Sequence, residues 1–189
     1  MYVCKASTWK NKQGAIIAFA TFIQHSSHVC YREILTVVKE NTKGFRESNI
    51  NLNKSLFDLF ASIFSVLRSN EEVVDGWVCE LIVPIIVEKI ADRKLSSVSK
   101  EILFSICELK KPEGIILLTV NSINSVKSPL VHEELLKWSK SMCQEFGSSS
   151  LESGIQTLIT WALKVSDMHF VIKCLNYANF SQRLLFLGM

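Results

Sequence analysis

Residues 51–68 read NLNKSLFDLFASIFSVLR, and this stretch decides the fold class of the chain. Its apolar side chains recur at steps of three and four positions, which places them on one broad face of a helix. They are Leu52, Leu56, Phe57, Leu59, Phe60, Ile63, Phe64 and Leu67. A helix with so wide an apolar face must bury that face against neighbouring helices. The stretch therefore predicts a core helix of a packed, all-α protein.

The same periodicity extends to both sides of this stretch. It predicts further helices over residues 13–24, 31–39, 78–90, 98–109, 115–123, 130–146 and 151–163. We expect Ser48-Asn49 and Ser96-Ser97 to cap the helices that follow them. Gly147 is placed to end a helix, and Pro112 and Pro129 to begin one. We find no alternating strand pattern that competes with the helical one.

The composition agrees with a single helical domain. The chain has 189 residues, of which 48% are apolar and 21% charged, enough for a core and too apolar for disorder. Only 7 Gly and 3 Pro are present, too few turn formers for a β-sandwich. No uninterrupted apolar run reaches the roughly 18 residues of a membrane span. The six cysteines form no C-x-x-C pair, and we expect them to be reduced, mostly as small buried residues.

The predicted helices come in pairs. The pairs begin near residues 3, 31, 73, 113 and 151, a spacing of roughly 30–40 residues that is typical of HEAT-type repeats. Because one helical hairpin cannot bury its own apolar face, neighbouring hairpins must stack. The pattern predicts an α-solenoid. A compact bundle of about eight to ten helices is the alternative.

Stacked hairpins place equivalent turns along the same edge. The turns expected within repeats lie at residues 7–12, 43–49, 92–96 and 125–129, and each contains at least one Lys or Arg. The turns expected between repeats, such as 69–72 and 147–152, are neutral or acidic. We therefore predict one basic edge, which the net charge of only +3 conceals.

Four stretches of the chain resemble a known family. They are Ser7-Thr8-Trp9-Lys10, then GFRESN at 44–49, VEKIADRK at 87–94 and HEELLKW at 132–138. Together they resemble the TOG domains of the microtubule polymerase family, and most closely the third TOG domain of the array. The likeness runs from about residue 7 to residue 165. It implies an α-solenoid of HEAT repeats over residues 1–175, about five of them, with the first helix and the last repeat incomplete, followed by an atypical tail at 176–189.

The resemblance implies which residues bind. In this family the loops within the repeats bind the α/β-tubulin heterodimer. The matching positions are Trp9 and Lys10 in the first loop, Phe45 and Arg46 in the second, Arg93 and Lys94 in the third, and Lys127 in the fourth. The fifth loop, at 165–171, carries no basic residue, although Lys164 and Lys173 flank it.

The expected function is binding rather than catalysis, with no metal and no cofactor. The pair His25-x-x-His28 lies at a predicted helix end, where two solvated histidines are expected, and the chain has no P-loop or G-x-S-x-G motif. We expect a monomeric domain of a larger chain that binds tubulin or microtubules but neither membrane nor nucleic acid. The implied location is the cytoplasm and the cytoskeleton, at spindle, centrosome and microtubule plus ends. The alternative is a HEAT scaffold or spacer that binds another protein and not tubulin.

Overall fold

The computed structural model describes residues 8–25, 34, 36, 38, 49–69, 74–124, 126–147 and 151–165. The helices of this part are α1 (Trp9–His25), α3 (Ile50–Ser69), α4 (Gly76–Lys89), α5 (Ser96–Leu109), α6 (Pro112–Ile123), α7 (Pro129–Phe146) and α8 (Glu152–Val165). Residues 34, 36 and 38, inside the predicted 31–39 helix, are helical as well. Every regular element of the described ranges is a helix, which confirms the all-α prediction.

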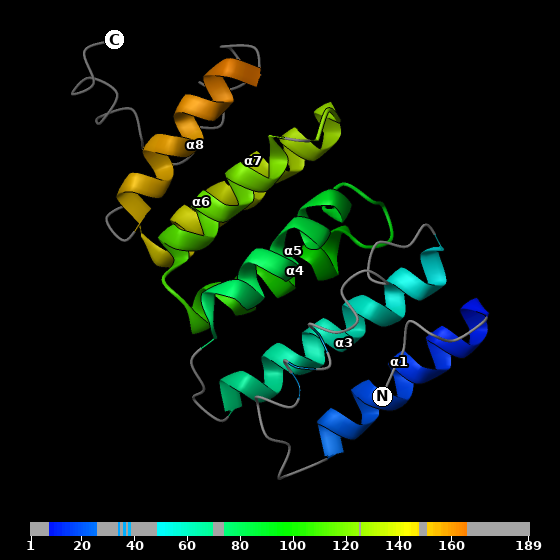
Figure 1. The fold of residues 1–189 in the computed structure, drawn as a ribbon. Coiled ribbons are helices and arrows are strands. Elements are labelled where there is room, and N and C mark those ends of the chain that lie inside the picture. Colours follow the sequence, from blue (N-terminus) through cyan, green and yellow to red (C-terminus); the bar gives the residue numbers. More distant parts are fainter. Residues whose placement is uncertain are drawn as a thin grey trace.

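The helices stack in two layers that follow each other along the chain (Figure 1). In one layer α3 lies between α1 and α5, and in the other α6 lies between α4 and α8. The chain alternates between the layers, with α4 packing on α5 and α6 on α7. Because each layer continues by adding helices side by side, the arrangement is the predicted α-solenoid and not the compact bundle.

Polar contacts within the layer of α1, α3 and α5 show that its helices run parallel. Gln13 near the start of α1 bonds Ser55 near the start of α3, at 3.1 Å from Nε2 to Oγ. Gln24 at the end of α1 bonds Ser62 further along α3, at 2.7 Å. Arg68 of α3 reaches Glu108 at the end of α5 at 2.8 Å. These partners lie 42, 38 and 40 positions apart, which agrees with the predicted repeat spacing.

The core runs along the interface of the two layers, and α3 contributes three of its buried aromatic side chains. Phe57, Phe60 and Phe64 of α3 are all fully buried. Among the described residues, α3 alone is also long and apolar enough to cross a membrane, by length and composition only. Since 61% of the qualifying window is buried inside the protein, α3 has the character of the core helix that its pattern predicts.

The helix ends agree with most of the expected signals. The Asn49 side-chain oxygen accepts hydrogen bonds from the backbone N–H groups of Asn51 and Leu52, at 2.9 and 3.2 Å, so the predicted cap of α3 is present. Pro112 and Pro129 begin α6 and α7. Gly147 ends α7 with a φ of 76°, a conformation that glycine adopts without strain.

Two expectations about helix ends are wrong. Ser96 and Ser97 do not cap α5, because the preceding turn supplies the hydrogen bonds and the Ser97 hydroxyl bonds Glu101 instead. Helix α1 begins at Trp9, four residues before the predicted start at Gln13. The polar residues 9–12 carry no apolar stripe, but Thr8 starts the helix by accepting a hydrogen bond at Oγ1 from the Asn11 backbone N–H at 3.3 Å.

Candidate protein-binding edge

The alternation of the chain gathers a set of helix ends and turns along one margin of the solenoid. They are the start of α1, the start of α3, the α4–α5 turn at 90–95, the α6–α7 turn at 124–128 and the end of α8 (Figure 1, right-hand and upper margin). We name this margin the turn edge, and the margin with the other helix ends the opposite edge. The turn edge carries every described residue of the predicted binding set.

Trp9 and Lys10 lie at the start of α1. The Thr8 cap places Trp9 at the first helical position, where its side chain is 42% exposed instead of packed into the stack. The Lys10 ammonium lies 5.8 Å from the centre of the indole ring, within the range of a cation–π contact. This pair presents a large apolar surface with a positive charge beside it. Phe45 and Arg46, predicted for the second loop, lie outside the described residues.

Arg93 and Lys94 are exposed in the α4–α5 turn, which Asp92 organises. The Asp92 carboxylate accepts a hydrogen bond from the Lys94 backbone N–H at 2.8 Å, and its carbonyl accepts from the N–H groups of Leu95 and Ser96 at 3.0 and 2.8 Å. Leu95 is fully buried beneath the turn. These bonds hold the two cations outward on a defined backbone.

Lys127 is exposed in the α6–α7 turn. The Val126 N–H bonds the Ile123 carbonyl at 2.8 Å, which closes the turn. His132, in the first turns of α7, donates from Nε2 to the Val126 carbonyl at 2.7 Å, and its ring meets Trp161 of α8 edge-on at 5.3 Å between centres. The backbone next to Lys127 is thus tied to α7 and, through the imidazole, to α8.

Lys164 extends the turn edge beyond the predicted set. It is exposed in the last turn of α8, and α8 ends at the same margin. The sequence analysis named Lys164 only as a neighbour of the fifth loop, and that loop, from 166 onward, lies outside the described residues. Its position follows from the parallel packing of α6 and α8 and not from any sequence motif.

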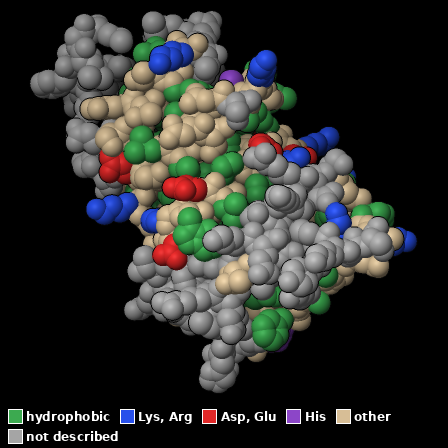
Figure 2. Space-filling view, in the orientation of Figure 1, with side chains coloured by type: hydrophobic (Ala, Val, Ile, Leu, Met, Phe, Trp, Pro, Cys, Tyr) green, Lys and Arg blue, Asp and Glu red, His purple; other side chains and the backbone are tan. Residues whose placement is uncertain are grey.

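Four cations of the turn edge are spaced apart and lack an ion-pair partner within the described part of the chain. Arg93, Lys94, Lys127 and Lys164 make no ion pair with any residue that the structure describes. Figure 2 shows Lys and Arg side chains at separate places along the upper and right-hand margins, with Asp and Glu side chains beside some of them.

The opposite edge also carries cations, which the sequence analysis did not weigh. Lys110 and Lys111 join α5 to α6 there. Glu108 precedes them in the sequence and Glu113 follows, but like Arg93 and Lys94 they make no ion pair with a described residue. Glu108 itself pairs with Arg68, and Glu113 accepts a hydrogen bond from the Ser153 hydroxyl. Lysines without a described ion-pair partner therefore occur at both edges, and they do not by themselves distinguish the turn edge.

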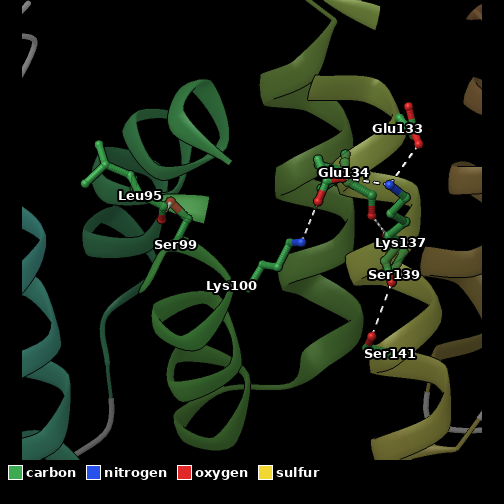
Figure 3. A network of polar contacts seen from close by, with 9 residues as sticks. Leu95, Ser99, Lys100, Glu133, Glu134, Lys137, Ser139 and Ser141 are labelled. Atoms are coloured by element: carbon green, nitrogen blue, oxygen red, sulfur yellow. Dashed lines mark hydrogen bonds and ion pairs between the residues drawn. The ribbon is translucent and has the colours of Figure 1, made fainter. Parts of the chain in front are cut away.

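A second group of charges joins α5 to α7 close to the turn edge (Figure 3). Lys100 of α5 lies 2.5 Å from Glu134 of α7, and Lys137 contacts both Glu133 and Glu134 at 2.8 Å. Burial alone would raise the pKa of Glu134, but the hydrogen bonds from Lys100 and Lys137 outweigh it and lower that pKa below its usual value. Hydrogen bonds to Glu133 and to Glu134 raise the pKa of Lys137. Both carboxylates of this region are therefore already paired.

The described residues include three cysteines and several side chains of the types that bind metals. Within these ranges, no three His, Cys, Asp or Glu side chains gather as metal ligands would. Burial raises the pKa of the Cys79 and Cys107 thiols, and raises that of Cys143 to about 11. These three cysteines are buried or half-buried inside helices, as predicted.

Comparisons with known proteins agree with the fold. No protein-family model matches the chain. Centrosomal protein 224 of Dictyostelium discoideum is 26% identical over 140 residues, a match that covers 64% of this chain and only 7% of that protein. Among solved structures, Drosophila melanogaster Mini spindles TOG3 matches with a TM-score of 0.67 at 17% identity, over 93% of this chain and 89% of its own.

A second solved structure carries the description "TOG-tubulin binding specificity promotes microtubule dynamics and mitotic spindle formation". It matches with a TM-score of 0.52 at 14% identity, over 85% of this chain and 80% of its own. The likeness to TOG domains that the sequence suggested, including a third TOG domain, is confirmed at the level of the fold. The chain is a HEAT-repeat α-solenoid with the fold of a TOG domain.

Proposed function

We propose that the turn edge binds the α/β-tubulin heterodimer, and that the chain is the tubulin-binding module of a longer microtubule-associated protein. The observation that carries this proposal is the position of Trp9. Its indole is 42% exposed at the same edge as Arg93, Lys94 and Lys127, although a tryptophan in a helical stack normally packs inward. A helix cap places it there, so its exposure is built into the fold.

The module would act by binding and not by catalysis. Tubulin is acidic, so the unpaired cations of the turn edge would steer its approach and set its orientation. Trp9 would then supply the apolar anchor, and truncation of such an anchor costs about 2–4 kcal/mol of binding free energy. Each basic turn would add about 0.2–1 kcal/mol when it pairs at the solvated rim. The affinity of the module should be modest and fall with salt.

The wider role follows from linkage to other modules. The chain matches only 7% of the length of Centrosomal protein 224. Several weak tubulin contacts in one longer chain would combine through effective concentration. Such a chain would hold tubulin near growing microtubule ends and so promote microtubule growth and organisation, with a place at spindle poles, centrosomes and plus ends.

The test compares two matched double substitutions on opposite edges. Trp9→Ala with Lys94→Ala removes an exposed tryptophan and a lysine from the turn edge. Trp77→Ala with Lys111→Ala removes the same residue types from the opposite edge, where the Trp77 side chain is 37% exposed. Co-elution with purified tubulin heterodimer should be lost for the first variant and retained for the second. Retention by both variants, or equal loss, would contradict the proposal.

The alternative is a scaffold that binds another protein and not tubulin. Ile17 and Phe22 favour it, because they are large apolar side chains of α1 that are 51% and 56% exposed. A scaffold that used this surface would show no tubulin binding by the unsubstituted chain. Its interactions would depend on these two side chains and not on Trp9.

A further inference from the structure

Leu130 is the most exposed large hydrophobic side chain of the described residues, at 64%. It is the second residue of α7, directly after Pro129 and three residues after Lys127. Its neighbour Val131 is 5% exposed and faces the core. The periodic pattern assigns Leu130 to the apolar residues of the helix, yet the fold turns it outward at the turn edge.

The backbone that carries Leu130 is firmly held. The Ser128 carbonyl accepts hydrogen bonds from the N–H groups of Val131 and His132, at 3.1 and 3.2 Å. The imidazole of His132 bonds back to the Val126 carbonyl and rests on Trp161, so the turn and the first turn of α7 form one unit. Little conformational freedom would be lost when a partner covers a side chain held in this way.

The charges around Leu130 indicate the kind of partner. The nearby carboxylates of Glu133 and Glu134 are paired with Lys137 and Lys100. Lys127 makes no ion pair with a described residue. The side chain of Leu130 therefore lies in a net positive surrounding, which favours an apolar pocket rimmed by acidic groups over a basic or neutral one.

We propose that Leu130 is a second apolar anchor of the turn edge and contacts the acidic surface of tubulin at the α6–α7 turn. This inference rests on the proposed function. Helices α3 and α5 lie between α1 and α7, so at about 8–10 Å for each of the two packed steps from α1 to α5, Leu130 lies more than roughly 16–20 Å from Trp9. One folded partner surface that offers two apolar pockets at that separation would engage both anchors, whereas a short acidic peptide would engage only one.

The test uses Leu130→Ala in the full chain, with Phe22→Ala as the matched control, and measures affinity for tubulin heterodimer by fluorescence anisotropy. Phe22 is similarly exposed but lies off the turn edge. Leu130→Ala should weaken binding about five- to tenfold, while Phe22→Ala and the conservative Leu130→Met stay within twofold of the unsubstituted chain. The loss from Leu130→Ala should persist at high salt, since it is apolar, and the loss from Lys127→Ala should shrink.

The outcomes separate this inference from the proposed function. If Trp9→Ala weakens binding and Leu130→Ala does not, the second anchor is refuted and tubulin binding by the edge stands. An equal loss in Phe22→Ala also refutes it, because exposed apolar area in general would then explain the effect. If the unsubstituted chain fails to bind tubulin, the proposed function itself fails.

Discussion

The packing of α8 on α6 can be tested with two glycines that occupy equivalent positions. Gly114 and Gly154 are each the third residue of their helix. A Cβ atom at Gly114 would meet nothing within 4 Å. A Cβ at Gly154 would lie 3.1 Å from the Glu113 backbone oxygen and 3.3 Å from the Ile116 Cβ. A substitution therefore gains the same helix propensity at both sites, but only at Gly154 does the new side chain meet neighbouring atoms.

The magnitudes follow from this difference. At Gly114, alanine should stabilise by up to about 1 kcal/mol through helix propensity alone. At Gly154 the same gain is offset, because the backbone oxygen cannot move aside and α8 must shift by a few tenths of an ångström. Leucine at Gly154 adds three further carbons to a filled site, and such overpacking typically costs about 1–3 kcal/mol. Leucine is also a strong helix former and meets open space at Gly114, so Gly114→Leu should keep most of that gain of up to about 1 kcal/mol.

Thermal unfolding followed by circular dichroism measures these differences. For a domain of this size 1 kcal/mol corresponds to roughly 2–4 °C, so Gly154→Leu should lower Tm by about 2–12 °C. Gly114→Leu should melt at the same temperature as the unsubstituted protein or up to about 4 °C above it. If Gly154→Leu melts at the same temperature as Gly114→Leu, α6 and α8 do not approach as closely as described, and the layer built on their contact is wrong.

Three further predictions concern single side chains. Hydrogen bonds from two lysines lower the pKa of Glu134 below its reference of 4.5, so the ionised carboxylate stabilises the fold above that pH and this stabilisation is lost on acidification. Glu134→Gln should therefore be less stable than the unsubstituted protein at pH 7. The difference in their free energies of unfolding, measured by chemical denaturation, should shrink below pH 4.5. Asp92→Ala should weaken tubulin binding about as much as Lys94→Ala, because it removes the side-chain acceptor that orders the turn. Asp92→Asn keeps an acceptor oxygen and should leave tubulin binding unchanged. An equal loss of binding in the Asn and Ala variants would refute a structural role for Asp92. Burial raises the pKa of the Cys107 thiol and raises that of the half-buried Cys143 to about 11, so both should react with a thiol reagent only after denaturant is added. Peptide mass spectrometry can measure this labelling. Rapid labelling in the native protein would contradict their burial.

The helices and their stacking could be predicted because they follow from periodicity. The apolar stripe around Phe57, Phe60 and Phe64 runs from Leu52 to Leu67, and only burial on neighbouring helices satisfies it. The helix starts were harder to place. Trp9 belongs to α1 although its neighbours carry no apolar repeat, since a single hydroxyl from Thr8 suffices to begin the helix.

The candidate edge could be predicted only in outline. The turns that carry Lys94 and Lys127 were evident, because they lie between strong helical patterns. Leu130 and Lys164 were missed for a physical reason: a leucine or a lysine in a helical repeat has no local signal for which side of the stack it will face. Their exposure depends on how α7 and α8 rotate against helices about 40 residues away in sequence, as the 40-residue separation of Glu113 and Ser153 illustrates.

Hydrogen–deuterium exchange of the full chain, with and without tubulin heterodimer, tests most directly whether one edge does the binding. The account predicts slower exchange in peptides that cover residues 9–12, 92–96 and 126–132 when tubulin is present, and unchanged exchange at 110–114 and 151–154 on the opposite edge. Protection at the opposite edge, or in no peptide at all, would contradict it.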